Sequence, residues 1–372
     1  MKSGAVTDGV LVLSTWRLAL AKPSVVAMST MLDVHPNRRP VAAAMGVATV
    51  LLALPASLLL SGAVADATAP ANNGQIVFRR YLGPDRTKGA IFTIAPDGTG
   101  ERQLTTPPVK ASDDFPDYAA DGSLVAFQRC ALTCRIYTVR PDATGVTSVG
   151  AGCSGAHEPP TCADNSYPAI SPDGTQIAFV HAFGSIRKDQ ISHVGIYAMG
   201  ADGSHQHRVT LPRTRTAEDV EPQWSPDGRR LVFVRQNVTA KPAGGHAVFV
   251  VNADGSGLRR ITPWKLHAGD GPDWSPDGSQ IIFRSPENDT FLNSNLFTIH
   301  PDGTGLRQVT HVPAKTKLYS ASFSPDGTAI TLGLTGIDQQ ADVFRMGIDG
   351  TGLSPVTRTH SWDSAPDWGG TT

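Results

Sequence analysis

Acidic residues recur at one place in a repeated unit of the sequence, a few residues ahead of a proline or its equivalent. They are Asp113, Asp114, Asp164, Glu218, Asp219, Asp270 and Asp363. Converging carboxylates create a local negative potential, which can hold a cation such as calcium or a basic peptide segment. Aspartates in turns also accept hydrogen bonds from backbone amides, so a capping role is the alternative for each residue. The pattern predicts a partner-binding site if the fold brings these residues together.

All four cysteines, Cys130, Cys134, Cys153 and Cys162, lie in one part of the chain. In an exported protein they are expected to form two disulfides, and of the three possible pairings we favour Cys130 with Cys134 and Cys153 with Cys162. Zinc is the alternative ligand. The CxxxC and CxxxxxxxxC spacings do not match common structural zinc sites, so no metal is assigned.

Two turn signals repeat along the chain. Ser-Pro-Asp-Gly occurs at 171–174, 225–228, 275–278 and 324–327, with a degenerate copy at 119–122. A second signal, Asp-Gly or Asp-Ala, lies between these at 97–98, 142–143, 202–203, 254–255, 302–303 and 349–350. The sequence from residue 75 therefore contains six copies of one unit, each roughly 50 residues long.

Each unit has the pattern of four short strands, which we call A to D in chain order, separated by turns rich in Pro and Gly. The first unit begins at Gln75 and lacks strand A, whereas Ala365–Trp368 matches the strand A pattern of Gly271–Trp274. The C-terminus is therefore expected to supply the missing strand. A ring of such sheets leaves no long unpaired edge. We predict an all-β fold, a six-bladed β-propeller over residues 75–372 with four-stranded blades, closed by a C-terminal strand that completes the N-terminal blade.

The repeats resemble a known family. Trp274-Ser275-Pro276-Asp277-Gly278 followed by Ile281-Ile282-Phe283, and Phe297–Gly303 with Arg307–Thr310, are similar to the WD-like repeat of TolB-type periplasmic proteins. The same repeats resemble the non-catalytic propellers of prolyl oligopeptidase relatives. The resemblance covers about residues 75 to 368. It implies a propeller that binds a protein or peptide of the cell envelope.

The strand directions predict which face binds. The short, uniform A–B and C–D turns lie on one face, and the longer B–C and D–A loops lie on the other. The B–C segments are 181–193, 236–246 and 285–295, and the D–A segments are 150–165, 211–221 and 311–319. The acidic residues precede strand A on the second face, so we expect them at one mouth of the central channel.

Linear motifs of catalysis are absent from the sequence. It contains no Gly-x-Ser-x-Gly elbow and no phosphate-binding loop. His157-Glu158 is followed by two prolines and then by no histidine, so it is not an HExxH motif. We assign no catalytic residue, and the sequence favours a non-catalytic protein over an enzyme. Propeller enzymes that use scattered channel residues without a linear motif are the alternative class.

The N-terminal part of the sequence predicts export. Arg38 and Arg39 precede an uncharged, apolar stretch from Pro40 to Ala65 that ends in Ala-Val-Ala, the pattern of a cleaved signal peptide. An uncleaved membrane anchor is the alternative. We interpret residues 1–30 as a non-native or disordered extension, 31–65 as the signal peptide and 66–74 as a linker. The protein is then extracellular or lies in the cell envelope or periplasm.

The charge composition limits the classes of partner that we expect. With 32 basic and 33 acidic residues the formal net charge is −1, so no global field attracts nucleic acid or anionic lipid. A membrane is involved only if the N-terminal segment stays uncleaved. We therefore expect a monomeric, non-catalytic exported propeller that binds a protein or peptide through the face bearing the B–C and D–A loops, without a cofactor. The alternative is a metal-dependent propeller hydrolase or lyase acting on an extracellular glycan or peptide, with calcium or another metal at the acidic mouth.

Overall fold

The computed structural model describes residues 72–150, 164–185, 190–212, 216–237, 245–285, 294–313, 316–335 and 340–371. All of them belong to one compact unit that begins at Ala65. The predicted extension and signal segment, and most of the linker, lie outside the described residues. Strand β1 begins at Asn73, slightly before the predicted start of the propeller at residue 75.

The strands follow the predicted four-strand unit. The A strands are β4 (Ser112–Tyr118), β8 (Asp164–Ile170), β12 (Ala217–Trp224), β16 (Gly269–Trp274), β20 (Leu318–Phe323) and β24 (Trp362–Gly370). The B strands are β1 (Asn73–Tyr81), β5 (Val125–Cys130), β9 (Gln176–Ser185), β13 (Arg230–Asn237), β17 (Ile281–Ser285) and β21 (Ala329–Thr335). The C strands are β2 (Gly89–Ile94), β6 (Cys134–Val139), β10 (Gln190–Gly200), β14 (His246–Asn252), β18 (Asn295–Ile299) and β22 (Ala341–Gly347). The D strands are β3 (Arg102–Gln103), β7 (Thr147–Ser148), β11 (His207–Arg208), β15 (Arg259–Arg260), β19 (Arg307–Gln308) and β23 (Ser354–Pro355).

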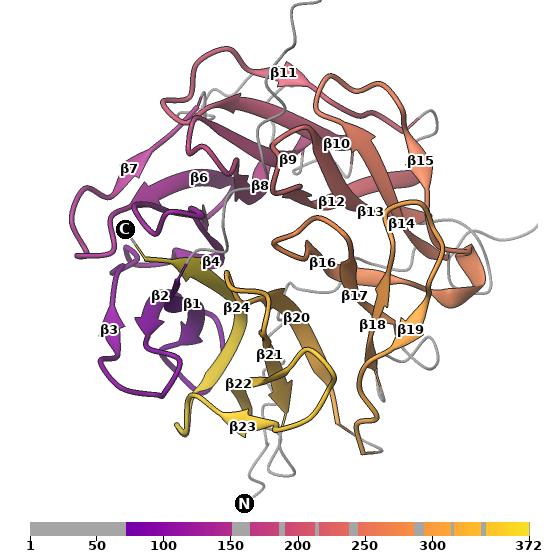
Figure 1. Ribbon diagram of the computed structural model, residues 1–372. Coiled ribbons are helices and arrows are strands. Elements are labelled where there is room, and N and C mark those ends of the chain that lie inside the picture. Colours follow the sequence, from indigo (N-terminus) through magenta and orange to yellow (C-terminus); the bar gives the residue numbers. More distant parts are fainter. Residues whose placement is uncertain are drawn as a thin grey trace, which may run out of the picture. The chain divides into compact units, whose positions relative to one another are not determined.

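The described strands form four sheets of four strands and one sheet of eight (Figure 1). The four-stranded sheets have the order A–B–C–D. The eight-stranded sheet contains two such sets, β8 to β11 and β12 to β15, which are joined by one parallel bridge between Val194 and Glu218. The one helical element in the described ranges is a short 3-10 helix, η2 (Trp264–Leu266). The all-β class and the strand order are therefore as predicted.

The last strand pairs with the first. Strand β24 runs antiparallel to β1, with Ile76 opposite Trp368 and Arg80 opposite Asp363. Ile76 and Trp368 share a core cluster with Val343 and Val356 of the last repeat. The A strands contact one another in the order β4, β8, β12, β16, β20 and β24, and β24 in turn contacts β4. The C-terminal strand thus completes the sheet of the first repeat, as the sequence pattern predicts.

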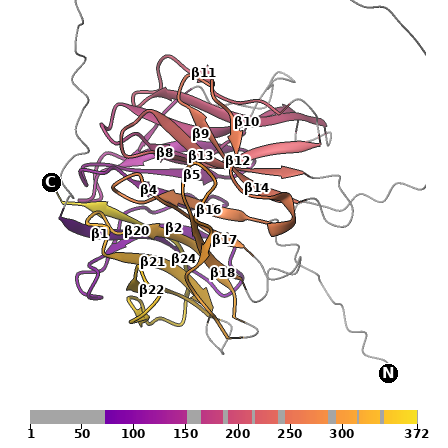
Figure 2. The ribbon, with the colours of Figure 1, turned by 45° about the vertical axis from the view of Figure 1, so that its right-hand side comes forward.

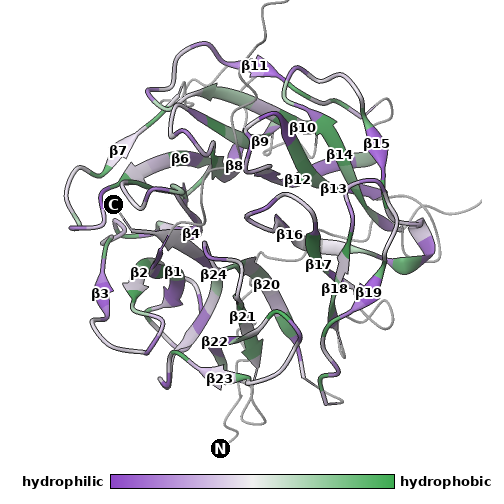
Figure 3. Cartoon of the chain, viewed as in Figure 1, coloured by the Kyte–Doolittle hydropathy of each residue, from purple (hydrophilic) through white to green (hydrophobic). Residues whose placement is uncertain are grey.

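Aromatic residues fill the interior of the sheets. A phenylalanine on five B strands is 0% exposed; these are Phe78, Phe127, Phe179, Phe233 and Phe283. Most of them pair with an aromatic ring of the C strand, for example Phe233 with Phe249 at a centroid distance of 5.7 Å. The outer strands β3, β11, β15 and β19 are hydrophilic instead (Figure 3). Burial therefore decreases from the inner strands to the outer edge of each sheet. Figure 2 shows the same strands turned by 45°.

The residues that recur in every unit serve the turns and the contacts between units. Asp173, from a Ser-Pro-Asp-Gly turn, accepts a hydrogen bond from the backbone N–H of Thr175 at 3.0 Å. Gly203 lies in the C–D turn of its unit and has φ +85°. A Cβ at this position would lie 2.3 Å from the backbone nitrogen of Gly150 in the preceding unit. Only glycine fits such a close approach.

One predicted loop is wrong. Residues 181–193 are expected as a long B–C loop, but β9 extends to Ser185 and β10 starts at Gln190, so most of the segment continues the hairpin. Its apolar and β-branched residues, such as Phe183 and Ile191, favour a strand over a loop. The B–C segments 238–244 and 286–293 lie outside the described residues.

Removal of β24 tests this arrangement. Deleting residues 364–372 exposes the core of the first sheet, including the fully buried Ile76 and Phe78. We expect a loss of at least about 4 kcal/mol in the free energy of unfolding, measured by urea titration. Deletion of Thr372 alone is the control. Equal stability of the two truncated proteins would contradict the role of β24.

Candidate functional site

Three of the predicted acidic residues lie inside the sheets, where each forms an ion pair with an arginine of the adjacent B strand. The pairs are Asp113–Arg129 at 2.6 Å, Asp219–Arg235 at 2.5 Å and Asp363–Arg80 at 2.7 Å. The three carboxylates are 0% exposed. The arginines also lie over aromatic rings, and Arg235, for example, is 4.8 Å from the ring centroid of Phe249. These acids hold strands A and B together within a sheet.

The same register position carries different pairs in other sheets. Asn165 contacts His181 at 2.6 Å, and Leu318 lies opposite Leu334. The ion pair is therefore one of several ways to fill this position. The structure gives the three aspartates a role in packing, and their binding of a partner stays a prediction.

The other four predicted acids have separate surroundings. Asp114 forms an ion pair with Arg79, which also donates to the Ser364 hydroxyl. Asp164 accepts a hydrogen bond from the backbone N–H of Cys134 at 2.8 Å. Burial raises the pKa of Glu218. The structure does not describe the side chain of Asp270. No group of three or more His, Cys, Asp or Glu residues in the described ranges is placed to hold a metal ion.

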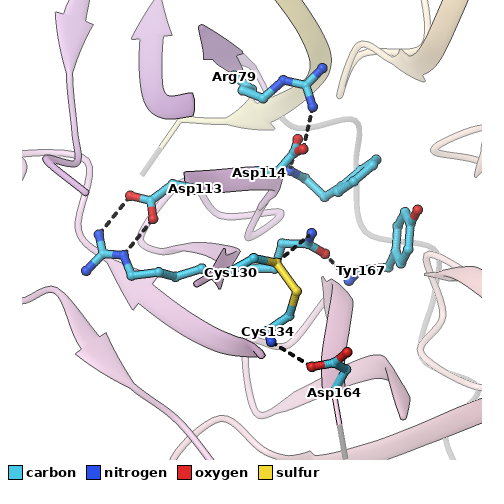
Figure 4. The surroundings of a disulfide bond; sticks show 10 residues. Arg79, Asp113, Asp114, Cys130, Cys134, Asp164 and Tyr167 are labelled. Carbon is cyan, nitrogen blue, oxygen red and sulfur yellow. Dashed lines mark hydrogen bonds and ion pairs between the residues drawn. A yellow bond between two sulfur atoms is a disulfide. The ribbon is translucent and has the colours of Figure 1, made fainter. Parts of the chain in front are cut away.

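The predicted disulfide between Cys130 and Cys134 is present (Figure 4), with an S–S distance of 2.01 Å. It connects the facing ends of β5 and β6. Next to it, Gln128 accepts a hydrogen bond from the backbone N–H of Tyr167 at 3.0 Å, so the disulfide adjoins the next A strand. Cys153 and Cys162 lie outside the described residues.

Aromatic and arginine side chains gather at the end of the A strands where the predicted acids lie. We call this group the mouth cluster; it consists of Arg79, Tyr81, Arg86, Phe115, Tyr167, Tyr319 and Trp362. The guanidinium of Arg86 lies 3.7 Å from the ring centroid of Trp362, whose ring is 5.5 Å from that of Tyr319. Arg79 lies over Tyr81 at 4.4 Å.

The cluster continues across the neighbouring strands. The rings of Phe115 and Tyr167 are 4.2 Å apart, and Figure 4 shows Tyr167 near the Asp114–Arg79 pair. Burial raises the pKa of Tyr319, and the charge of Arg79 is among those that oppose this effect. This cluster was not predicted from the sequence. The sequence signal that would have identified it is an aromatic residue at positions whose residue type differs between repeats.

Three aspartates of the A strands, each in a Pro-Asp-aromatic sequence, form a second group that was not predicted. Each accepts a hydrogen bond from a backbone N–H of the next A strand: Asp117 from Ile170 at 2.6 Å, Asp273 from Phe323 at 2.9 Å and Asp367 from Tyr118 at 2.7 Å. Burial, and then the Asp367 carboxylate, raises the pKa of Asp273 to about 7. The same two causes raise the pKa of Asp117. These carboxylates connect neighbouring sheets at the centre.

The fold and these connections define a β-propeller. Residues 161–310 match the family described as the TolB beta propeller domain. In this part of the chain the repeats are therefore similar to those of TolB-type β-propellers. Solved TolB structures are similar to this fold. TolB from Acinetobacter baumannii gives a TM-score of 0.58 at 17% identity, over 81% of this chain and 68% of that chain. A putative TolB from Agrobacterium tumefaciens gives 0.54 at 19% identity, over 79% and 91% respectively.

A curated relative is also similar in sequence. The uncharacterized peptidase YuxL of Bacillus subtilis (strain 168) is 30% identical over 97 residues, which is 26% of this chain and 13% of that protein. The chain thus matches a small part of that relative's length. Within the described ranges, no helix is long and apolar enough to cross a membrane.

The buried ion pairs give a first prediction for this region. Asp219→Leu leaves the Arg235 charge buried without its partner, which we expect to cost about 3–5 kcal/mol of folding free energy. The double variant Asp219→Leu with Arg235→Leu copies the Leu318–Leu334 pair and should recover most of this loss. Urea unfolding measures both. A double variant as unstable as the single one would contradict a packing role.

The pKa of Asp273 gives a second prediction. Because its folded-state pKa, about 7, exceeds the unfolded value of about 4, the unfolded chain loses this proton first as the pH rises. Stability therefore falls between about pH 4 and pH 7, by at most about 1.4 kcal/mol per pH unit from this group. Asp273→Asn should make that slope shallower in urea titrations at several pH values.

The control for this experiment is Asp302→Asn. Hydrogen bonds from Thr304 lower the pKa of Asp302, so its contribution falls below this pH range. The slope between pH 5 and 7 should not change in the control. An identical slope in the wild type and in Asp273→Asn would show that the Asp273 carboxyl titrates normally.

Proposed function

We propose that this protein is an exported, six-bladed propeller that binds a protein or peptide partner through its mouth cluster, without catalysing a reaction. The observation that carries the proposal is the concentration of Tyr, Trp and Arg side chains at one end of the A strands. These residue types dominate the binding energy of protein interfaces. The cluster also combines residues that are far apart in sequence, since Phe115 and Tyr167 come from early repeats and Tyr319 and Trp362 from the last strands.

The acidic residues of the sequence suggest a basic partner segment. The ion pairs that these residues form favour a different kind of partner. Asp113, Asp219 and Asp363 are neutralised by arginines inside the sheets, and Asp114 is paired with Arg79. These four carboxylates therefore add no unpaired negative charge that would attract a basic partner. Aromatic surface and the edges of the arginines are the groups that a partner would contact.

The six-bladed ring is part of the proposal. It is supported by the cyclic order of contacts between the A strands and by the pairing of β24 with β1. The eight-stranded sheet then corresponds to two blades joined by the single bridge at Val194.

Export is supported by the signal-like sequence at residues 31–65 and by the Cys130–Cys134 disulfide. Disulfides persist in oxidising compartments outside the cytosol. We propose that the partner is a protein or peptide of the cell envelope and that the propeller acts as a monomer.

Affinity purification from the native cell tests the proposal. The wild-type protein, tagged after Thr372, should retain one partner at near-stoichiometric amounts. Trp362→Ala with Tyr319→Ala should lose that partner at least tenfold, because the aromatic surface is removed. Leu306→Ala, an exposed residue (46%) at a C–D turn, is the matched control and should retain it. Equal retention by all three proteins would contradict binding at the mouth cluster.

The second candidate is a metal-dependent hydrolase or lyase acting on an extracellular glycan or peptide. The short match to a peptidase supports it. Stoichiometric metal in the purified protein, with hydrolysis that stops after chelation, would favour this function over binding alone.

A further inference from the structure

Five A strands hold the residue before their proline in the left-handed region of backbone conformation. The residues are Phe115 (φ 47°), Tyr167 (φ 50°), Glu221 (φ 56°), Gly271 (φ 57°) and Ala365 (φ 52°). Each lies at a β-bulge, where the pairing register with the B strand shifts. The bulge is therefore a feature of the repeat, whereas the residue type at the bulge differs from one repeat to the next.

Left-handed backbone is unfavourable for bulky residues and free of strain for glycine. Gly271 demonstrates that the fold accepts glycine at this position. Phe115, Tyr167 and Glu221, on three consecutive A strands, nevertheless carry large side chains. Residues kept in strained conformations cluster at functional sites, where the side chain is needed for more than packing.

We call these three side chains, which come from consecutive A strands, the arc. The Phe115 and Tyr167 rings are 4.2 Å apart with an interplanar angle of 46°, and the Glu221 charge acts on the Tyr167 hydroxyl. Glu221 accepts a hydrogen bond from the backbone N–H of Gly271 at 2.6 Å, which connects the arc to β16. All three side chains are half-buried, so each keeps some exposed surface.

The arc offers aromatic faces beside charges that already have partners. Arg79 is paired with Asp114 directly beside Phe115, and Glu221 is bonded to the main chain. A charged ligand group would have to compete with these contacts. An uncharged apolar group would lose only water on entering.

We propose that Phe115 and Tyr167 are the specificity-determining residues of the mouth cluster and, with Glu221 beside them, receive an uncharged apolar side chain of the partner polypeptide. This inference rests on the proposed function and deepens it. It predicts that glycine at positions 115 or 167 relieves backbone strain and removes binding, whereas the same change at Ala365 relieves strain only.

The test uses four blocked amino acids as probes, the N-acetyl amides of tryptophan, leucine, lysine and glutamate, with saturation-transfer NMR on the full chain. The tryptophan and leucine amides should bind the wild type and Ala365→Gly alike. Binding should fall at least tenfold in Phe115→Gly and in Tyr167→Gly. The lysine and glutamate amides should bind at least tenfold more weakly than the tryptophan amide.

Circular dichroism verifies that each variant is folded, and if one glycine variant unfolds, the other still supplies the comparison. Unchanged probe binding in a folded glycine variant, or preferred binding of the lysine or glutamate amide, would overturn the proposal. The two proposals fail separately. If Trp362→Ala with Tyr319→Ala loses the cellular partner but Tyr167→Gly keeps it, the arc is wrong and the binding function stands. If the apolar probes bind the arc but no cellular partner depends on the mouth cluster, the proposed function is wrong and the arc stands as a binding site.

Discussion

The hydrogen bond from a backbone N–H of one A strand to an aspartate of the preceding A strand determines how neighbouring sheets meet. Asp117, Asp273 and Asp367 each accept such a bond. A buried carboxylate needs partners, and an A strand at the edge of its sheet has N–H groups that point away from the B strand. One interaction satisfies both groups. The mouth cluster sits on the same strands, so its geometry depends on these bonds.

Much of the fold follows from the sequence because its signals are local or periodic. The turn sequences place the strands, the Pro-Asp-Trp copy at 366–368 identifies β24 as an A strand, and the close spacing of Cys130 and Cys134 indicates their disulfide. The extension of β9 and β10 into the segment 181–193 was not predicted. Polar residues there obscure the alternation by which a strand is recognised.

The candidate site was harder to predict because neighbouring strand residues point to opposite sides. Asp113 and Asp114 are adjacent in sequence, yet Asp113 is buried against Arg129 inside its sheet and Asp114 faces Arg79 at the mouth. A bulge follows directly and changes which side each later residue occupies. The sequence carries the charges but not this register. The aromatic residues at 115 and 167 escaped notice for another reason, since they resemble ordinary strand residues until their backbone conformation is known.

The outer strands have a consequence for the behaviour of the protein in solution. Each D strand in the described residues is two residues long, and most are hydrophilic. A sheet edge this short offers too few free backbone groups to template a strand of another molecule. In the described part of the chain, which is almost wholly β-structure, the outer edges therefore disfavour edge-to-edge aggregation at high concentration.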